Sequence, residues 1–205
     1  MIPLSELGNR FFHRENIPPW KKTATEIFSH LESGVPIALS DGALKVLEHA
    51  SLEAHNHNGS SIWAHHILLG LSHDEEIRRE LGELPFSVSL LFKETWYAVD
   101  EKSTPLKKLD FTPKAIRTLR LGIDEAISSG SNQLLPLDLL IGIIITAQEN
   151  CVSTTVSAQE NTIDSFGLLS LVSEEQLENL RRKRRDIEED RKIADSVADF
   201  FKPVN

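Results

Sequence analysis

Apolar residues recur at intervals of three and four along residues 41–55, the spacing that places side chains on one face of a helix. Ser40 precedes this run and is of a type preferred at helix N-caps. Similar runs predict a helix over residues 62–71 and another over residues 73–81, the latter begun by Ser72 and Glu75, which have capping-box spacing. A fourth helix is predicted in "SVSLLFKETWYAVDE". Strict alternation of apolar and polar residues is weak throughout, so the pattern predicts an all-α fold.

The helical pattern occurs twice in the chain. When Ser40 is laid on Thr112, "SDGALKVLEHASLEA" matches "TPKAIRTLRLGIDEA" and, without a gap, "IWAHHILLGL" matches "LLPLDLLIGI". This superposition, which we call the repeat alignment, also brings Leu68 onto Leu140 and Gly70 onto Gly142. The chain therefore contains an internal repeat of a four-helix unit. We expect each unit to bury one face internally and to pack another on its twin, in a tandem pseudo-twofold array.

The histidines of the first unit have no counterpart in the second. Four of them align with other residue types, so that His55, His57, His65 and His66 correspond to Ile127, Ser129, Leu137 and Asp138. The apolar skeleton around them is retained, which indicates that the fold does not need them. Neutral imidazole binds zinc or iron, but adjacent helical residues point about 100 degrees apart. We therefore favour a hydrogen-bonding role for His66, predict no metal site, cofactor or catalytic residue, and keep a histidine-based metal enzyme as an alternative.

The composition is that of a folded protein with an acidic surface. The 205 residues are 40% hydrophobic and 26% charged, with a net charge of −9. Nucleic-acid affinity comes largely from clustered lysine and arginine, so no nucleic-acid partner is expected. A single cysteine, Cys151, and the lack of a signal-peptide pattern or an 18-residue apolar stretch predict a cytoplasmic protein without a membrane segment. No phosphate-binding loop motif occurs, so no motor ATPase is expected within the sequence.

Two segments resemble a known family. The run "HILLGL" at residues 66–71 and the helix start "FTPKA" at residues 111–115 are similar to motifs of the Clp N-terminal repeat domain, and the resemblance covers residues 40–172. It implies an all-helical module that binds adaptors or substrate proteins for a Clp-type ATPase and protease and does no chemistry itself. Some family members bind phosphoarginine through an acidic residue just before the motif histidine of each unit. The matching positions here are His65 and Leu137, which are not acidic, so this property does not carry over.

The repeat divides the chain into three parts. We expect a helical N-terminal extension over residues 1–39 and a double-repeat domain over residues 40–172. The units of that domain span residues 40–103 and 112–172. Residues 173–205 form the remaining part, a charged C-terminal helix.

The C-terminal helix begins with a capping-box pair, Ser173 and Gln176. Its basic run "RRKRR" lies at four-residue spacing from acidic residues, which is typical of a solvated helix. The helix also carries a sparse apolar edge, formed by Leu177, Leu180, Ile187 and Val197. This edge is sufficient for docking on the body or on a second copy, which leaves a homodimer through this helix open.

The surface of the repeats supplies the candidate partner-binding residues. Trp63 is either part of the core or an exposed anchor for a partner. The motif histidine, the residue before it and their counterparts in the second unit are added to Trp63. The candidates are therefore Trp63, His65, His66, Leu137 and Asp138. The expected function is a non-enzymatic protein-binding module, an adaptor or regulator of a Clp-type ATPase/protease system. A stand-alone helical scaffold or an oligomeric regulator without a Clp link is the main alternative.

Overall fold

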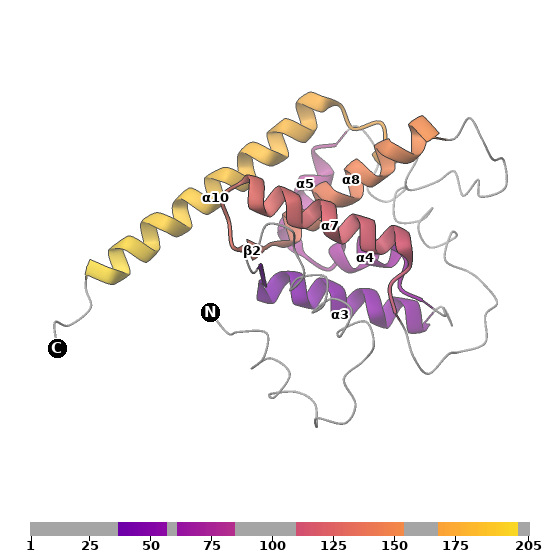
Figure 1. Cartoon of the computed structure of the whole chain (residues 1–205), viewed down its shortest axis with the longest axis horizontal. Helices are drawn as coiled ribbons and strands as arrows, with labels where there is room; N and C mark the ends of the chain where they lie inside the picture. Colours follow the sequence, from indigo (N-terminus) through magenta and orange to yellow (C-terminus); the bar gives the residue numbers. More distant parts are fainter. Residues whose placement is uncertain (1–36, 57–60, 85–109, 154–167, 201–205) are drawn as a thin grey trace, which may run out of the picture.

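The computed structural model describes residues 37–56, 61–84, 110–153 and 168–200, which are mostly helical (Figure 1). Their helices are α3 (Asp41–Asn56), α4 (Ala64–Leu71), α5 (Glu75–Gly82), α7 (Pro113–Ser128), α8 (Pro136–Ser153) and α10 (Glu174–Phe200). Two short strands are β1 (Ala38–Leu39) and β2 (Gln133–Leu134). The all-α prediction is confirmed. Residues 1–36 of the predicted N-terminal extension and the helix predicted in "SVSLLFKETWYAVDE" lie outside the described residues.

Side-chain caps explain where the first helix of each unit begins. Ser40 Oγ accepts a hydrogen bond from the Ala43 amide at 3.0 Å, at the start of α3. Thr112 Oγ1 accepts one from the Ala115 amide at 3.3 Å, at the start of α7. Each bond satisfies an amide that has no partner within its own helix. The repeat alignment equates the two caps, so the repeat extends to the helix boundaries.

The start of α5 differs from its prediction. Asp74, and not Ser72, is the N-cap, and its Oδ1 accepts a hydrogen bond from the Ile77 amide at 3.0 Å. Ser72 instead follows the last residue of α4, where its Oγ donates to the Leu69 carbonyl at 2.6 Å. Both residue types are good cap formers, and Asp74 is used because α5 begins at Glu75, directly after it.

Short strand pairs that the sequence pattern did not predict interlock the two units. β1 pairs in parallel with β2, and the repeat alignment relates this pair to the parallel bridge between Ile62 and Phe111. The Ser40 amide donates to the Leu134 carbonyl at 3.0 Å, and the Thr112 amide donates to the Ile62 carbonyl at 3.0 Å. In each pair, the segment before one unit's first helix bonds to the segment before the other unit's second helix. The pseudo-twofold relation is therefore present in the backbone hydrogen bonds.

Within each unit the two main helices approach each other closely at a glycine. A Cβ atom on Gly142 of α8 would lie 2.5 Å from the Thr118 carbonyl oxygen and 2.8 Å from the Gly122 amide nitrogen of α7. A Cβ atom on Gly70 of α4 would likewise overlap the Val46 carbonyl oxygen of α3. The repeat alignment equates these two glycines and the two carbonyls that they approach. All eight residues of α4 are buried.

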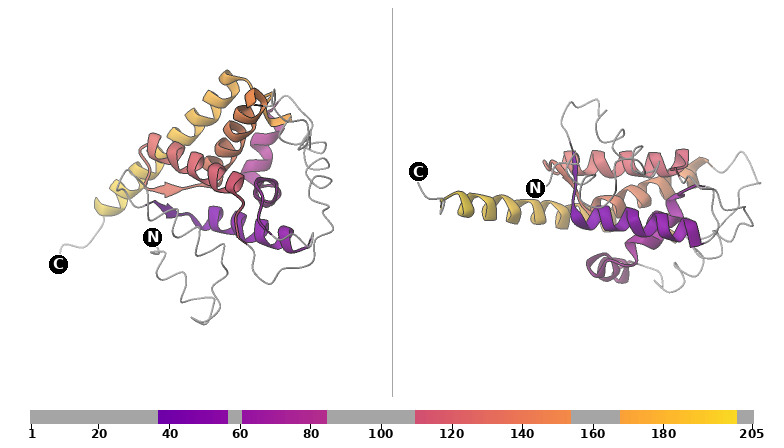
Figure 2. Two further views of the ribbon diagram at one scale, coloured as in Figure 1. Left: turned by 45° about the vertical axis from the view of Figure 1, so that its right-hand side comes forward. Right: turned by 90° about the horizontal axis from the view of Figure 1, so that it is seen from below.

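α10 packs beside α7 and α8 and extends past the body at its C-terminal end (Figures 1 and 2). It begins with the predicted capping box, since the Ser173 amide donates to Gln176 Oε1 at 2.9 Å and the Gln176 amide donates to Ser173 Oγ at 3.2 Å. No helix in the described part of the chain has the length and apolar character needed to cross a membrane.

The prediction of a solvated C-terminal helix is wrong for the face of α10 that touches the body. Two charged residues, Glu188 and Arg184, are buried there, the latter only 1% exposed. Leu177 and Leu180 of the predicted apolar edge are also buried, in agreement with docking on the body, whereas the other two residues of that edge are exposed. Four-residue spacing shows the pairs that form within a helix, but it carries no information about charges on another element. The counter-charge of Arg184 comes from Asp138 in α8.

Candidate protein-binding faces

The side chains at positions 66 and 138, which the repeat alignment equates, each accept a hydrogen bond from the backbone amide three residues earlier. His66 Nδ1 accepts a hydrogen bond from the Trp63 amide at 2.9 Å, before the first turn of α4. Asp138 Oδ2 accepts one from the Leu135 amide at 2.7 Å, before the first turn of α8. A neutral imidazole and a carboxylate can both accept such a bond. The hydrogen-bonding role favoured for His66 is confirmed, and it explains why the two residue types are interchangeable for the fold.

The structure places one of the five candidate binding residues on the surface. Trp63 is 40% exposed at the N-cap of α4. The other four candidates are buried, namely His65, His66, Leu137 and Asp138. Burial, with a smaller contribution from Lys114, lowers the pKa of His65 to about 4, so its imidazole is neutral at pH 7. The contact of these residues with a partner stays a prediction.

The histidines do not form a metal site in the described ranges. No group of three histidine, cysteine, aspartate or glutamate residues suited to a metal ion occurs there. His49 and His73 stack with ring centroids 4.3 Å apart, and His73 Nε2 lies 3.7 Å from Glu53 Oε1. Stacked rings direct their nitrogen lone pairs side by side and not at a common point. His55 is exposed at the end of α3, and His57 lies outside the described residues.

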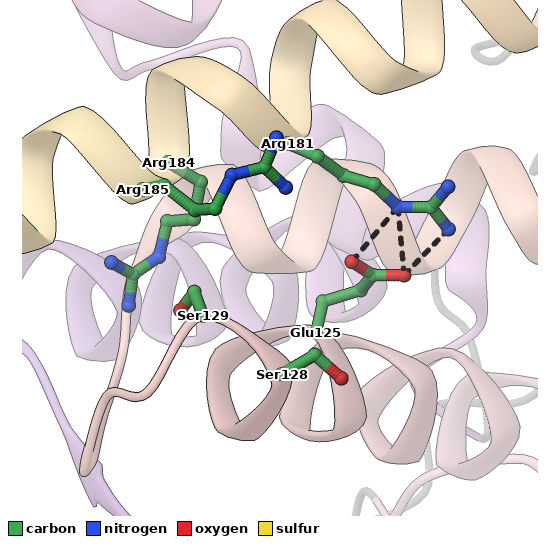
Figure 3. A pocket seen from close by; sticks show the side chains of 6 residues that line it. All are labelled: Glu125, Ser128, Ser129, Arg181, Arg184 and Arg185. Carbon is green, nitrogen blue, oxygen red and sulfur yellow. Dashed lines mark hydrogen bonds and ion pairs between the residues drawn. The ribbon is translucent and has the colours of Figure 1, made fainter.

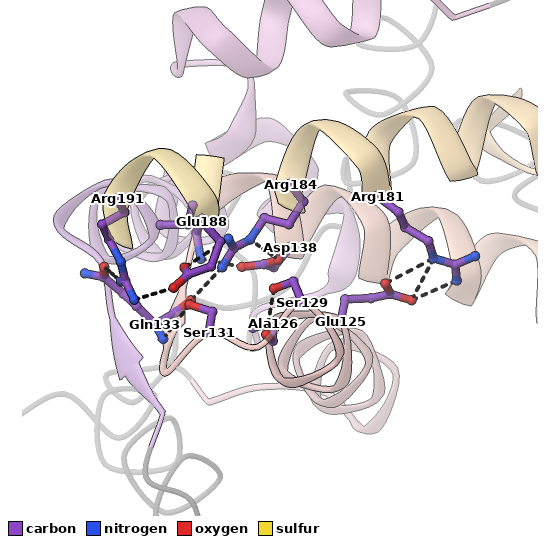
Figure 4. A network of polar contacts seen from close by, with 11 residues as sticks. Glu125, Ala126, Ser129, Ser131, Gln133, Asp138, Arg181, Arg184, Glu188 and Arg191 are labelled. Atoms are coloured by element: carbon purple, nitrogen blue, oxygen red, sulfur yellow. Dashed lines mark hydrogen bonds and ion pairs between the residues drawn. The ribbon is translucent and has the colours of Figure 1, made fainter. Parts of the chain in front are cut away.

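Asp138 of the second unit lies at the centre of a buried ionic network (Figure 4). Arg184 Nε of α10 donates to Asp138 Oδ1 at 2.7 Å, and Arg184 Nη2 donates to the Gln133 carbonyl at 3.0 Å. Arg184 Nη1 lies 3.5 Å from Glu188 Oε2. Burial raises the pKa of Asp138 to about 6, although Arg184 and the Leu135 amide favour the ionised form. α10 thus covers the motif position of the second unit.

Two further arginines hold α10 on either side of this network. Arg181 Nη2 and Nε donate to the two oxygens of the Glu125 carboxylate, at 2.8 and 3.1 Å. Arg191 Nη1 donates to Gln133 Oε1 at 2.9 Å, and its Nη2 donates to Asn132 Oδ1 at 3.2 Å. The hydrogen bond to Glu125 raises the pKa of Arg181. All three arginines therefore bond from α10 to the second unit.

Sequence reasoning named Asp138 but missed the residues that bind it. One signal was present, because an aspartate within the apolar run "LLPLDLLIGIII" is buried and must have a counter-charge. The basic run of the C-terminal helix offers that charge. The spacing of the residues could not identify Arg184, because its neighbours in the run are also basic and the contact spans 46 residues.

A cavity of about 270 Å³ lies along the seam between α7 and α10. Figure 3 shows its lining side chains, which are Glu125, Ser128, Ser129, Arg181, Arg184 and Arg185. Each guanidinium group there is already paired with a carboxylate, since Arg181 pairs with Glu125, Arg184 with Asp138 and Arg185 with Glu178. The cavity therefore offers little uncompensated positive charge to an anion, and we assign no ligand to it.

The interlocked pair of helical units with its close glycine contacts defines a Clp N-terminal-like helical fold. The N-terminal domain of Hsp104 from Candida albicans aligns with 70% of this chain and 91% of its own length, at 11% identity and a TM-score of 0.53. A structure from an investigation of a malarial protein secretion system aligns with 72% of this chain and 95% of its own, at 16% identity and a TM-score of 0.56. No family model matches the sequence. At these identities the likeness shows the fold.

Proposed function

We propose that the chain is a non-enzymatic protein-binding module that acts in the cytoplasm as an adaptor or regulator of a Clp-type ATPase/protease system. The fold shared with the Hsp104 N-terminal domain supports the Clp link, as do the motifs at residues 66–71 and 111–115. A protein partner would meet the start of α4 at Trp63, the exposed candidate, whereas the other four candidates are buried at the starts of α4 and α8.

The exposed indole of Trp63 is the observation that carries this proposal. A surface tryptophan at 40% exposure is a typical interface anchor, because it buries a large area with few rotatable bonds. Its backbone is held by the bond from the Trp63 amide to His66 and by the neighbouring bridge between Ile62 and Phe111. A fixed backbone lowers the entropy that is lost when a partner covers the ring. Trp63 is therefore presented in a form suited to binding.

Affinity capture from the source cells, followed by binding measurements with purified components, tests the proposal. We expect a Clp-type ATPase or its peptidase to be recovered, and we expect Trp63→Ala to weaken its binding about tenfold or more, or about 1.4 kcal/mol. The matched control is Ile193→Ala, which truncates another exposed apolar residue, on α10. Recovery of no Clp component, or equal binding by the Trp63→Ala chain, contradicts the proposal.

A stand-alone scaffold that forms a homodimer is the second candidate function. It is favoured by the C-terminal end of α10, which extends past the body and exposes Ile193 and Val197 (Figure 2). Exposed apolar residues on a projecting helix suit self-association. Sedimentation velocity over a concentration series decides the matter, because a dimer through this end is weakened by Val197→Asp, whereas a monomer at all concentrations rejects the candidate.

A further inference from the structure

α10 turns a charged side toward the body. Its buried leucines, Leu177 and Leu180, lie in its first two turns. Beyond them, the side chains that bond to the second unit are the arginines at positions 181, 184 and 191. Farther along the helix, Ile193 and Val197 are exposed. The segment 181–191, which we call the ionic strap, therefore holds to the body mainly through polar contacts.

The surface under the strap consists of hydrogen-bond acceptors (Figure 4). Bonds from the three arginines run in one direction: the guanidinium groups donate, and oxygens of Glu125, Asn132, Gln133 and Asp138 accept. We call these four residues the acceptor row. Guanidinium has donors in a planar fork and no acceptor, so it matches carboxylate and carbonyl oxygens arranged in this way. The row therefore selects a helix that carries arginines at the spacing of α10.

The acceptor row is repeated only in part, since Glu125 corresponds to Glu53 of the first unit but the acceptors at positions 133 and 138 have no equivalent there. The repeat alignment equates Asp138 with His66 and Gln133 with Ser61. A histidine at position 66 supplies no carboxylate for a guanidinium group. The scaffold is repeated, but the oxygens that receive Arg184 and Arg191 lie in the second unit, where these arginines hold α10. Lys183 of α10 also pairs with Glu80 of α5, in the first unit.

An interface of this composition is suited to opening. Burying ionic groups costs free energy that their pairing only partly returns, so a polar interface is weaker than an apolar one of the same shape. When the strap leaves, the row that it uncovers is polar, whereas the apolar contacts of α10 are made by Leu177 and Leu180, which precede the strap. Polar contacts of this kind resemble those of transient interfaces between domains.

We propose that the acceptor row is an exchangeable docking face for an arginine-bearing helix, and that α10 is its resident occupant. The chain thereby closes the binding face of its second unit, while Trp63 in the first unit stays exposed. This inference deepens the proposed function and rests on it for the biological partner. The exchange of α10 itself is independent of any ATPase and can be measured without one.

Binding of a fluorescent peptide of residues 173–200 to the full-length chain tests the exchange. The peptide can bind only while the resident helix has left the row. Its apparent affinity is therefore its intrinsic affinity multiplied by the fraction of time that the row is open. We therefore expect the Arg184→Ala chain to bind the peptide at least tenfold more tightly than the unmodified chain. A peptide that itself carries Arg184→Ala should bind the Arg184→Ala chain at least tenfold more weakly than the unmodified peptide does. The control is the Arg185→Ala chain, whose lost side chain pairs with exposed Glu178, and which should bind like the unmodified chain.

Hydrogen exchange of the unmodified chain supplies a measurement that needs no variant. The amides of residues 184–198 should exchange faster than those of α7 and α8, because the strap opens without global unfolding. The proposal is overturned if α10 exchanges only with the whole protein, or if the Arg184→Ala chain binds the peptide no better than the unmodified chain. Failure to capture a Clp-type ATPase would remove the proposed function and leave these results unchanged, so the two failures are distinguishable.

Discussion

Replacement of Gly142 by alanine tests the close contact on which each unit is built. The new Cβ atom would lie 2.5 Å from the Thr118 carbonyl oxygen, whereas ordinary van der Waals contact begins at 3.4 Å. α7 and α8 must therefore separate by roughly 0.9 Å, the difference between these distances. The obstacle is the backbone of a neighbouring helix and not a flexible side chain, so rotamer changes cannot relieve it.

The magnitude follows from two opposing contributions. Overpacking of a core costs about 1–3 kcal/mol, and a backbone obstacle places this site at the upper end, about 3 kcal/mol. Alanine has a higher helix propensity than glycine, which returns about 1 kcal/mol. We expect Gly142→Ala to lower the free energy of unfolding by about 2 kcal/mol, and Gly70→Ala to behave alike. For a chain of this size, the melting temperature should fall by about 4–8 °C.

Urea and thermal unfolding, followed by circular dichroism, measure the effect, and Gly82→Ala is the matched control. Gly82 is the last residue of α5, and a Cβ atom there would have no atom within 4 Å. The same substitution should therefore be neutral or stabilising by up to about 1 kcal/mol at this position. If Gly142→Ala were as stable as the unmodified chain, the close approach of α7 and α8 would be refuted. A comparable loss in Gly82→Ala would refute the assignment of the loss to that contact.

Two further predictions concern a helix cap and a buried carboxyl group. Thr112→Ala removes the cap of α7 and should cost about 1 kcal/mol in urea unfolding, whereas equal stability would show the cap to be dispensable. Burial raises the pKa of Asp138 from 3.8 to about 6, so the docked state of α10 binds this proton more tightly than an open state in which Asp138 is solvated. As pH falls from 7 to 4, opening of α10 should become less favourable, measured by hydrogen exchange corrected for intrinsic rates. Asp138→Asn should lose this dependence, and increased opening in acid in the unmodified chain would contradict it.

The features that the sequence predicted well are those with a local or periodic cause. The helices α3 and α7 follow from apolar spacing, and their caps follow from residue type at Ser40 and Thr112. The repeat alignment also predicted which glycines would be equivalent. This equivalence was visible in the sequence because both Gly70 and Gly142 lie where two helices approach closely. A side chain at either position would overlap the backbone of the neighbouring helix.

The features that the sequence did not reveal depend on contacts between distant segments. β1 and β2 have two residues each, too few to show a period, and their pairing is decided by how the units interlock. The burial of Arg184 was missed for a related reason. Intrahelical spacing offered it Glu188, and that pair does form, but the shorter contact is with Asp138 on another helix. A local pattern can therefore be correct and still misjudge whether a helix is solvated.

A repeated scaffold with different residues at one equivalent position is the way in which this chain acquires two unlike faces. Position 66 and position 138 both accept the amide bond that begins a helix, so either a histidine or an aspartate satisfies the fold. The two differ in what their remaining atoms can bind. The aspartate has a second oxygen, which receives the guanidinium group of Arg184 and thereby seats α10. Because the cap tolerates both residue types, binding chemistry can change at this position without a change of fold. The second face carries the carboxyl oxygen that receives Arg184 of α10, and the first presents Trp63.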